Sequence, residues 1–192
     1  MEPVTDWEQR YKDEATGWDL GTISLPLKEY FDQVPNKTIK ILIPGCGKGH
    51  EASYLHRNGF SNVFLLDLAP SPLHDFGIQH PTFPKKHLLE ANFFEHQGQY
   101  DLIVEQTFFC AIYPIHRQAY AKKAYELLHT KGKLMGLLWS VKLNENHPPF
   151  GGSKQEYKDY FDEYFNFIHF ENAYNSIQPR SGRELFLLAK KK

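Results

Sequence analysis

The sequence lacks several features that would assign it to whole classes of protein. It contains only two cysteines, Cys46 and Cys110, which lie far apart in the chain. They form no disulfide framework and are typical of a reducing cytosol. No stretch approaches the roughly 18 consecutive apolar residues that a membrane span needs. Residues 1–6 show no basic start followed by an apolar run, so no signal peptide is expected. We therefore expect a cytoplasmic protein without a membrane partner.

The chain also lacks an excess of charge of either sign. It carries 22 Lys and Arg against 23 Asp and Glu, and no basic stripe stands out. Nucleic acid is therefore not an expected partner. The 10 histidines are scattered without metal-ligand spacing, so no metal site is predicted. The expected ligand is a small molecule. The oligomeric state does not follow from the sequence, and a monomer is the expectation.

The 192 residues fit one domain, 1–192, with a full core. Apolar runs and helical stretches alternate along it. Strands are predicted at 39–43, 63–66, 87–91, 100–105, 133–139, 165–170 and 184–189, and helices at 49–58, 71–79, 114–128 and 153–164. The alternation predicts an α/β fold with a seven-stranded, mostly parallel sheet and helices on both faces. A turn at 179–182 predicts an antiparallel C-terminal strand.

Candidate site residues follow the predicted strands, because ligands in such sheets bind beyond the carboxyl ends of the strands. The first strand runs into Gly45-x-Gly47-x-Gly49 and then into a helix. Glycines permit positive φ and a close approach of ligand to backbone. The helix start adds free N–H groups. Asp67 ends the next strand, where a carboxylate can accept both ribose hydroxyls of a nucleoside.

A dinucleotide-binding domain would share this outline, and the glycine spacing separates the two. The dinucleotide fingerprint needs a glycine three residues after the second one, where this sequence has His50. The spacing present here is typical of nucleoside-dependent methyltransferases. A plain strand–turn–helix connection is the alternative for the glycine loop alone, and a surface acid is the alternative for Asp67 alone. Their order in the chain favours a nucleoside site.

Several motifs resemble a known family across nearly the whole chain. They are Trp7-x-x-x-Tyr11, Gly17-Trp18-Asp19-Leu20-Gly21, the glycine loop, Tyr100-Asp101-Leu102-Ile103, Phe108-Phe109-Cys110-Ala111-Ile112, Arg117 and His147-Pro148-Pro149-Phe150. The sequence is similar to the thiopurine S-methyltransferase superfamily, and most closely to its plant-type halide and thiol methyltransferase branch, the harmless-to-ozone-layer-like proteins. The resemblance implies a Rossmann-like class I methyltransferase fold. It also implies S-adenosylmethionine as cofactor and S-adenosylhomocysteine as product.

The resemblance also implies roles for individual residues. Residues 1–21 would form an aromatic lid, although a helix docked on the sheet is the alternative for this segment. The implied cofactor contacts are Trp7, Tyr11, Trp18, Gly45, Gly47, Asp67, Leu68, Asn92, Phe93 and Gln106. Asn92 stands where the branch has Asp, and an amide can accept and also donate. Gln106 and Trp139 stand where it has Tyr, and both departures fall near the expected acceptor pocket.

The expected reaction is methyl transfer to a halide, hydrosulfide, thiocyanate or small thiol. An activated methyl group and a soft anion need positioning, desolvation and water exclusion more than a general base. No general base is therefore predicted, and the acceptor-pocket candidates are Phe109, Trp139 and Phe150. Alternatives are a thiopurine or selenium/tellurium methyltransferase of the same superfamily and a non-catalytic nucleoside-binding regulatory module.

Other residues near these motifs are expected to have structural roles. For Phe108 and Phe109, a position in the core is an alternative of equal weight to a position in the pocket. Cys110 is expected to be a small buried residue rather than a nucleophile. Arg180 and Arg183, near the last turn, are expected to be ordinary surface charges.

Overall fold

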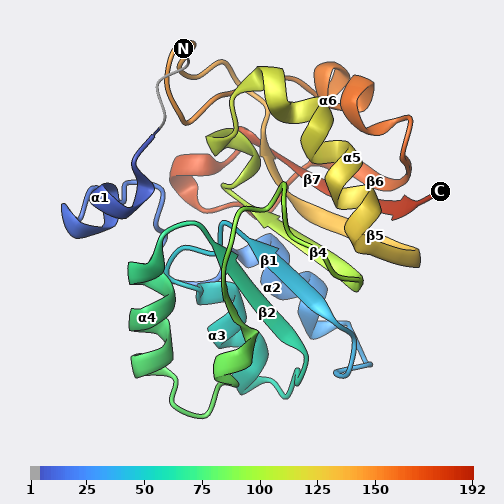
Figure 1. The fold of residues 1–192 in the computed structure, drawn as a ribbon. Coiled ribbons are helices and arrows are strands. Elements are labelled where there is room, and N and C mark those ends of the chain that lie inside the picture. The colour runs from blue at the N-terminus through green and yellow to red at the C-terminus, as the bar shows by residue number, and fades with distance from the viewer. Residues whose placement is uncertain (1–4) are drawn as a thin grey trace.

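A seven-stranded sheet organises the chain in the computed structural model, which describes residues 5–192. Its order is β3-β2-β1-β4-β5-β7-β6. Among the described strands, β7 is antiparallel to both of its neighbours and the other pairs are parallel, which confirms the predicted sheet (Figure 1). The strands are β1 (Ile41–Pro44), β2 (Val63–Asp67), β3 (Leu88–Glu90), β4 (Tyr100–Gln106), β5 (Leu128–Trp139), β6 (Phe165–Asn172) and β7 (Glu184–Lys191).

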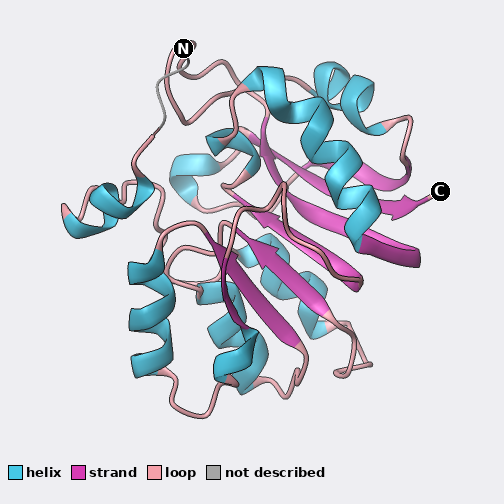
Figure 2. Ribbon diagram, in the orientation of Figure 1, coloured by secondary structure: helices cyan, strands magenta, loops and turns pink. Residues whose placement is uncertain are grey.

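Helices cover both faces of this sheet (Figure 2). One core cluster joins α5 and α6 to the sheet, and the other joins α2, α3 and α4 to the opposite face. Within residues 5–192, no helix is long and apolar enough to cross a membrane. The helices are α1 (Trp7–Lys12), α2 (Leu25–Asp32), α3 (His50–Arg57), α4 (Pro70–Gln79), α5 (Arg117–Leu127) and α6 (Lys154–Phe161), with short 3₁₀ turns at Lys85–His87, Phe109–Ala111, Pro114–His116 and Gln178–Arg180.

Several element boundaries differ from the sequence prediction. The helix predicted over 114–128 begins only at Arg117, because 114–116 forms a 3₁₀ turn. The strand predicted from residue 133 begins at Leu128 and includes the Lys131-Gly132 pair, where Lys131 has a φ of 70°. This irregularity coincides with a register shift against β4. Helix α2 was not predicted, because its short apolar face is buried only by the tertiary structure.

Strand β1 ends in a turn whose backbone conformation only glycine adopts without strain. Ile41, Leu42 and Ile43 are at most 2% exposed, as expected for a parallel strand covered on both faces. Directly after this strand, Gly45 has a φ of 57°, and an added Cβ would lie 2.3 Å from the ring of Phe108. The backbone here is left-handed and in close contact with its neighbours, so the glycine is required by geometry.

A buried carboxylate near the end of β4 fixes the following turn. Glu105 is 1% exposed, and its Oε1 accepts hydrogen bonds from the N–H groups of Phe108 (2.9 Å) and Phe109 (2.8 Å). Its Oε2 accepts a bond from the hydroxyl of Tyr120 at 3.2 Å. Burial nevertheless raises the pKa of Glu105 to about 7. The turn that follows β4 thus depends on a group that titrates near neutral pH.

We predict that Glu105 makes the unfolding free energy depend on pH. Between 4.5, the ordinary pKa of Glu, and about 7, folded Glu105 keeps a proton that the unfolded chain releases. Stability therefore falls as pH rises through this window, by roughly 2–4 kcal/mol at about 1.4 kcal/mol for each pKa unit. Glu105→Gln keeps an acceptor oxygen and should lose this slope. Urea denaturation of both proteins between pH 5 and 8 tests it, and equal slopes would contradict it.

Candidate active site

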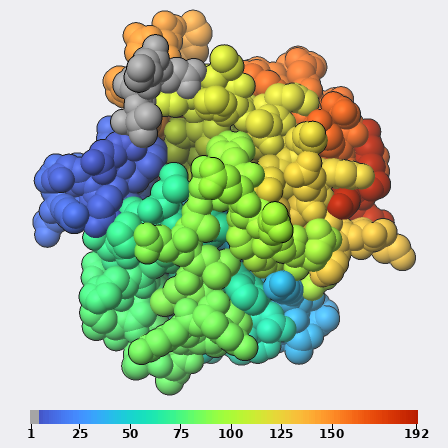
Figure 3. All heavy atoms as spheres, viewed as in Figure 1, coloured from blue at the N-terminus to red at the C-terminus, as the bar shows by residue number. Residues whose placement is uncertain are grey.

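A cavity of about 740 Å³ opens where the parallel strands end. Its walls come from α1, from residues at or just after the ends of β1, β2, β3, β4 and β5, and from the loops at 148–149 and 179–183. In the space-filling view, α1 stands out from the left edge of the molecule (Figure 3). The cavity therefore lies at the predicted edge of the sheet and combines segments from the whole length of the chain.

Asp67 lies at the cofactor end expected for this cavity. It is 6% exposed, and burial raises the pKa of its carboxyl group. Its Oδ2 accepts a bond from the Gly47 N–H and its Oδ1 one from the Ala69 N–H, both at 3.0 Å. A carboxylate oxygen has more than one lone pair, so Asp67 can still accept hydroxyl donors from the cavity that it lines.

Leu68, Asn92 and Phe93 line the same cavity as Asp67. Leu68 is 56% exposed at its mouth, which leaves an apolar surface for a ligand to cover. The Oδ1 of Asn92 accepts a bond from the Phe94 N–H at 3.0 Å. The amide nitrogen of Asn92 is thus the group best able to act on a ligand, as a donor.

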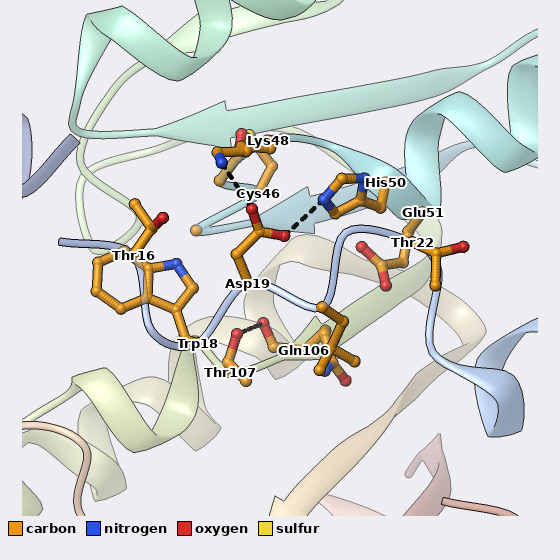
Figure 4. Close-up of a pocket in the computed structure, with 13 residues that line it drawn as sticks. Thr16, Trp18, Asp19, Thr22, Cys46, Lys48, His50, Glu51, Gln106 and Thr107 are labelled. Atoms are coloured by element: carbon orange, nitrogen blue, oxygen red, sulfur yellow. Dashed lines mark hydrogen bonds and ion pairs between the residues drawn. The ribbon is translucent and has the colours of Figure 1, made fainter. Parts of the chain in front are cut away.

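The segment containing Trp18 and Asp19 is fixed to the glycine loop by charge. The carboxylate of Asp19 lies 2.7 Å from both Lys48 Nζ and His50 Nε2, as Figure 4 shows. Burial opposes ionisation of Asp19, but hydrogen bonds from Lys48, the Gly21 N–H and His50 lower its pKa to about 2. We call residues 16–22 the strap. Its Trp18 carbonyl accepts a further bond from Arg180 Nη2 at 2.9 Å.

A smaller pocket of about 40 Å³ lies beside the large cavity, and Figure 4 shows the residues that line it. Gln106 and Gly47 line this pocket, while Trp18 and Gly45 border both spaces. The Oε1 atom of Gln106 is buried without a hydrogen-bond partner among residues 5–192. Asp19 and Glu51 add carboxylates nearby. The unpartnered Oε1 of Gln106 therefore suits a hydrogen-bond donor, whereas the charge of Asp19 is already offset by Lys48, which also lines this pocket.

The predicted aromatic lid consists of two parts with different attachments. In α1, Trp7 and Tyr11 contact Trp18 edge to face, with ring centroids 5.6 and 5.8 Å apart. Every residue of α1 is described and none is buried, so α1 is not a helix docked on the sheet. It lies beside α4, where Glu8 accepts bonds from the N–H and hydroxyl of Ser71 (Figure 1). Residues 1–4 of the predicted lid lie outside the described residues.

The far end of the cavity contains two arginines that the sequence prediction placed on the surface. Arg180 is 6% exposed and pairs with Glu184 at 3.2 Å, so that prediction was wrong for Arg180. The guanidinium carbons of Arg180 and Arg183 each lie 5.2 Å from the ring centroid of Trp139. Trp139 and both arginines line the cavity. The sequence contained a signal for this position. The predicted last strand is antiparallel, so it begins at the edge of the sheet where the parallel strands end, and both arginines lie just before it.

Phe109 and Phe150 were predicted to face the acceptor pocket, but they lie behind the cavity wall. Both are at most 2% exposed. The ring of Phe109 packs against Tyr120 at 5.0 Å, and that of Phe150 packs against Tyr113 at 4.8 Å. Phe109 reaches the core because Glu105 accepts bonds from the N–H groups of the turn after β4, and Phe150 is tied to that turn by its N–H bond to the Cys110 carbonyl. They support the wall, whereas Trp139 forms part of it.

Cys110 does form part of the wall. Its thiol donates a bond to the Thr107 carbonyl at 3.2 Å, and burial raises its pKa to about 12. At neutral pH the side chain is therefore a neutral thiol. This agrees with the expectation that Cys110 is a small buried residue.

Known proteins resemble this chain along most of its length. Thiocyanate methyltransferase 1 of Brassica oleracea is 29% identical over 184 residues, which cover 93% of this chain and 81% of that protein. The thiopurine S-methyltransferase of Acinetobacter baylyi is 25% identical over 183 residues, covering 83% of this chain and 84% of that protein.

A solved structure shows the same fold at lower identity. It is the 1,6-didemethyltoxoflavin-N1-methyltransferase of Burkholderia thailandensis, solved with 1,6-didemethyltoxoflavin and S-adenosylhomocysteine. It superposes with a TM-score of 0.71 at 13% identity, covering 100% of this chain and 93% of that one. The family model described as thiopurine S-methyltransferase (TPMT) matches residues 3–185. The resemblance noted in the sequence is thereby confirmed, and the chain belongs to the thiopurine S-methyltransferase family.

Proposed function

We propose that this chain transfers the methyl group of S-adenosylmethionine to a small, soft anion, namely a halide, hydrosulfide, thiocyanate or small thiolate. Family membership makes the chain an S-adenosylmethionine-dependent methyltransferase, and the acceptor is the proposal. One observation carries it. A single cavity joins the carboxylate of Asp67 to an end walled by Trp139, Cys110 and two guanidinium groups. The name of the Brassica relative, a thiocyanate methyltransferase, supports the same acceptor class.

The residues present fit the proposed cofactor. Asp67 would accept the ribose hydroxyls, and Leu68, Phe93 and the amide of Asn92 would contact adenine. The unpartnered Oε1 of Gln106 would accept the ammonium group of the methionine part. The lid aromatics Trp7, Tyr11 and Trp18 would cover it. When bound, S-adenosylmethionine supplies a methyl group on a positively charged sulfur, which is already activated for displacement.

The far end of the cavity has the properties that a soft anion needs. The ring of Trp139 and the apolar wall remove water, which a poorly hydrated anion such as iodide tolerates best. Arg183 contributes positive potential where such an anion would arrive, whereas the charge of Arg180 is offset by Glu184. Cys110 stays neutral, so it does not compete for the methyl group. The chain thus binds, orients and desolvates its acceptor without supplying a base.

We predict that Asp67→Ala weakens binding of S-adenosylhomocysteine roughly ten- to a hundredfold, because a buried charge-assisted bond contributes about 1.5–3 kcal/mol. Calorimetry on the folded variant measures this loss. Asp75→Ala is the matched control, since the side chain of Asp75 is 66% exposed on α4. Unchanged affinity in Asp67→Ala would remove Asp67 from the site.

The two parts of the lid should respond differently to cofactor. Helix α1 has six residues, which is too short for stability alone, so cofactor contacts should increase amide protection across 5–15. The strap at 16–22 is held by Asp19 and Arg180 and should be protected in both states. Hydrogen exchange with and without S-adenosylhomocysteine tests this. Equal protection of 5–15 in both states would show that α1 is not a lid.

The acceptor proposal predicts a rank order of kcat/KM in which iodide and hydrosulfide exceed a thiopurine. Trp139→Ala should reduce this selectivity at least about threefold while the affinity for S-adenosylhomocysteine stays within about twofold, because the ring limits the space at the far end of the cavity. Trp7→Ala is the matched control. It removes a ring from the lid and should weaken cofactor affinity without changing acceptor selectivity.

A wild-type preference for the thiopurine would overturn the acceptor proposal. That result would leave the methyltransferase activity in place and would favour the heterocyclic acceptor named for the Acinetobacter relative. Methyl transfer from labelled S-adenosylmethionine measures all the acceptors in one assay.

A further inference from the structure

We propose that Arg117 is a positioning residue for the methyl acceptor. It touches neither expected ligand, and it acts by holding the wall of the acceptor end formed by Pro148 and Pro149. The inference rests on the proposed function, because that function makes this end of the cavity the acceptor site. The geometry around Arg117 carries it.

Arg117 is a cation in the core. It begins α5 and is 0% exposed. Its guanidinium carbon lies 4.8 Å from the ring centroid of Phe109 and 5.6 Å from that of Tyr157. Its Nε has no hydrogen-bond partner in the described part of the chain. Removing a charge from water is expensive and an unpaired N–H adds to that expense, so general stability does not explain this placement.

Two hydrogen bonds of Arg117 go to residues 150–151, which follow Pro149 in the loop at 148–151 that we call the acceptor loop. Nη1 donates to the Gly151 carbonyl at 3.0 Å, and Nη2 donates to the Phe150 carbonyl at 3.3 Å. Nη1 also pairs with Glu156 on α6 at 3.0 Å. Two consecutive carbonyls next to Pro149 are therefore fixed by one rigid group. The planar fork of Arg matches this task, whereas a lysine ammonium lacks the fixed fork geometry.

The same framework fixes the other parts of the acceptor wall. The Phe150 N–H donates to the Cys110 carbonyl at 2.7 Å. The hydroxyl of Tyr157, whose ring faces Arg117, donates to the Trp139 carbonyl at 2.7 Å. From the outer side, Asn144 Nδ2 donates to the Pro149 carbonyl at 3.2 Å. Wall segments far apart in sequence thus converge on Arg117, while Asn144 holds the same loop from the exposed side.

The test compares two variants that loosen the loop from opposite sides. Arg117→Lys keeps the charge and loses the fork, and it should raise KM for iodide about tenfold. Asn144→Ala removes the exposed side-chain bond to the Pro149 carbonyl and keeps the backbone N–H bond to it at 3.3 Å, and it should raise the same KM about threefold. In both, the dissociation constant of S-adenosylhomocysteine should stay within about twofold. Lys122→Gln is the control, since it removes an exposed cation from the same helix.

A readout without turnover accompanies the kinetics. Calorimetric titration of thiocyanate into the complex with S-adenosylhomocysteine should show the same loss of acceptor affinity as KM. An unchanged KM and thiocyanate affinity in Arg117→Lys would overturn the proposal. Equal loss of acceptor and cofactor affinity would also overturn it, because a general structural defect moves both. If Arg117→Lys does not fold, Asn144→Ala decides, and unchanged acceptor affinity there is the contrary result.

A failure of the proposed function can be distinguished from a failure of the role proposed for Arg117. If the wild type methylates only a thiopurine, the soft-anion acceptor is wrong, and KM for the thiopurine is then compared in the same variants. A selective rise in that KM would still support Arg117 as a positioning residue.

Discussion

The hydrogen bond from the Gly47 N–H to the carboxylate of Asp67 joins the ends of β1 and β2, and the proposed cofactor site depends on it. A carboxylate that is 6% exposed needs donors, and the described structure supplies them from backbone turns. The turn after β1 presents its N–H groups only in a left-handed conformation. The glycine spacing and Asp67 therefore depend on each other. The strap is attached to the glycine loop through the ion pair between Asp19 and Lys48.

The proposed acceptor end depends on a different constraint, because buried charged side chains there hold the cavity walls in place. Glu105 directs the turn after β4, Arg117 fixes the loop before α6, and Arg180 joins the strap to the Trp139 wall. Each buried charge has hydrogen-bonded partners, which offsets part of its desolvation. Arg180 also links the two ends, since it contacts both the Trp18 carbonyl and the Trp139 ring.

The sequence predicted those features that depend on local pattern. Apolar runs located the strands, and the position of Asp67 after the second strand placed it beside the glycine loop, because parallel strand ends meet at one edge. It could not predict burial that depends on distant partners. Arg180 is buried because Glu184 and the Trp18 carbonyl receive it, and Phe109 turns inward because Glu105 holds its N–H. Such outcomes follow from tertiary contacts and leave no periodic trace in the sequence.

The central claim is that one cavity holds the cofactor at Asp67 and a soft anion at Trp139. Iodide scatters X-rays anomalously, so a crystal grown with S-adenosylhomocysteine and iodide would locate both ligands in one experiment. The account predicts ribose hydroxyls on Asp67 and an anomalous peak in the wall formed by Trp139, Cys110 and Pro149. Iodide bound only on the outer surface, or cofactor away from Asp67, would contradict it.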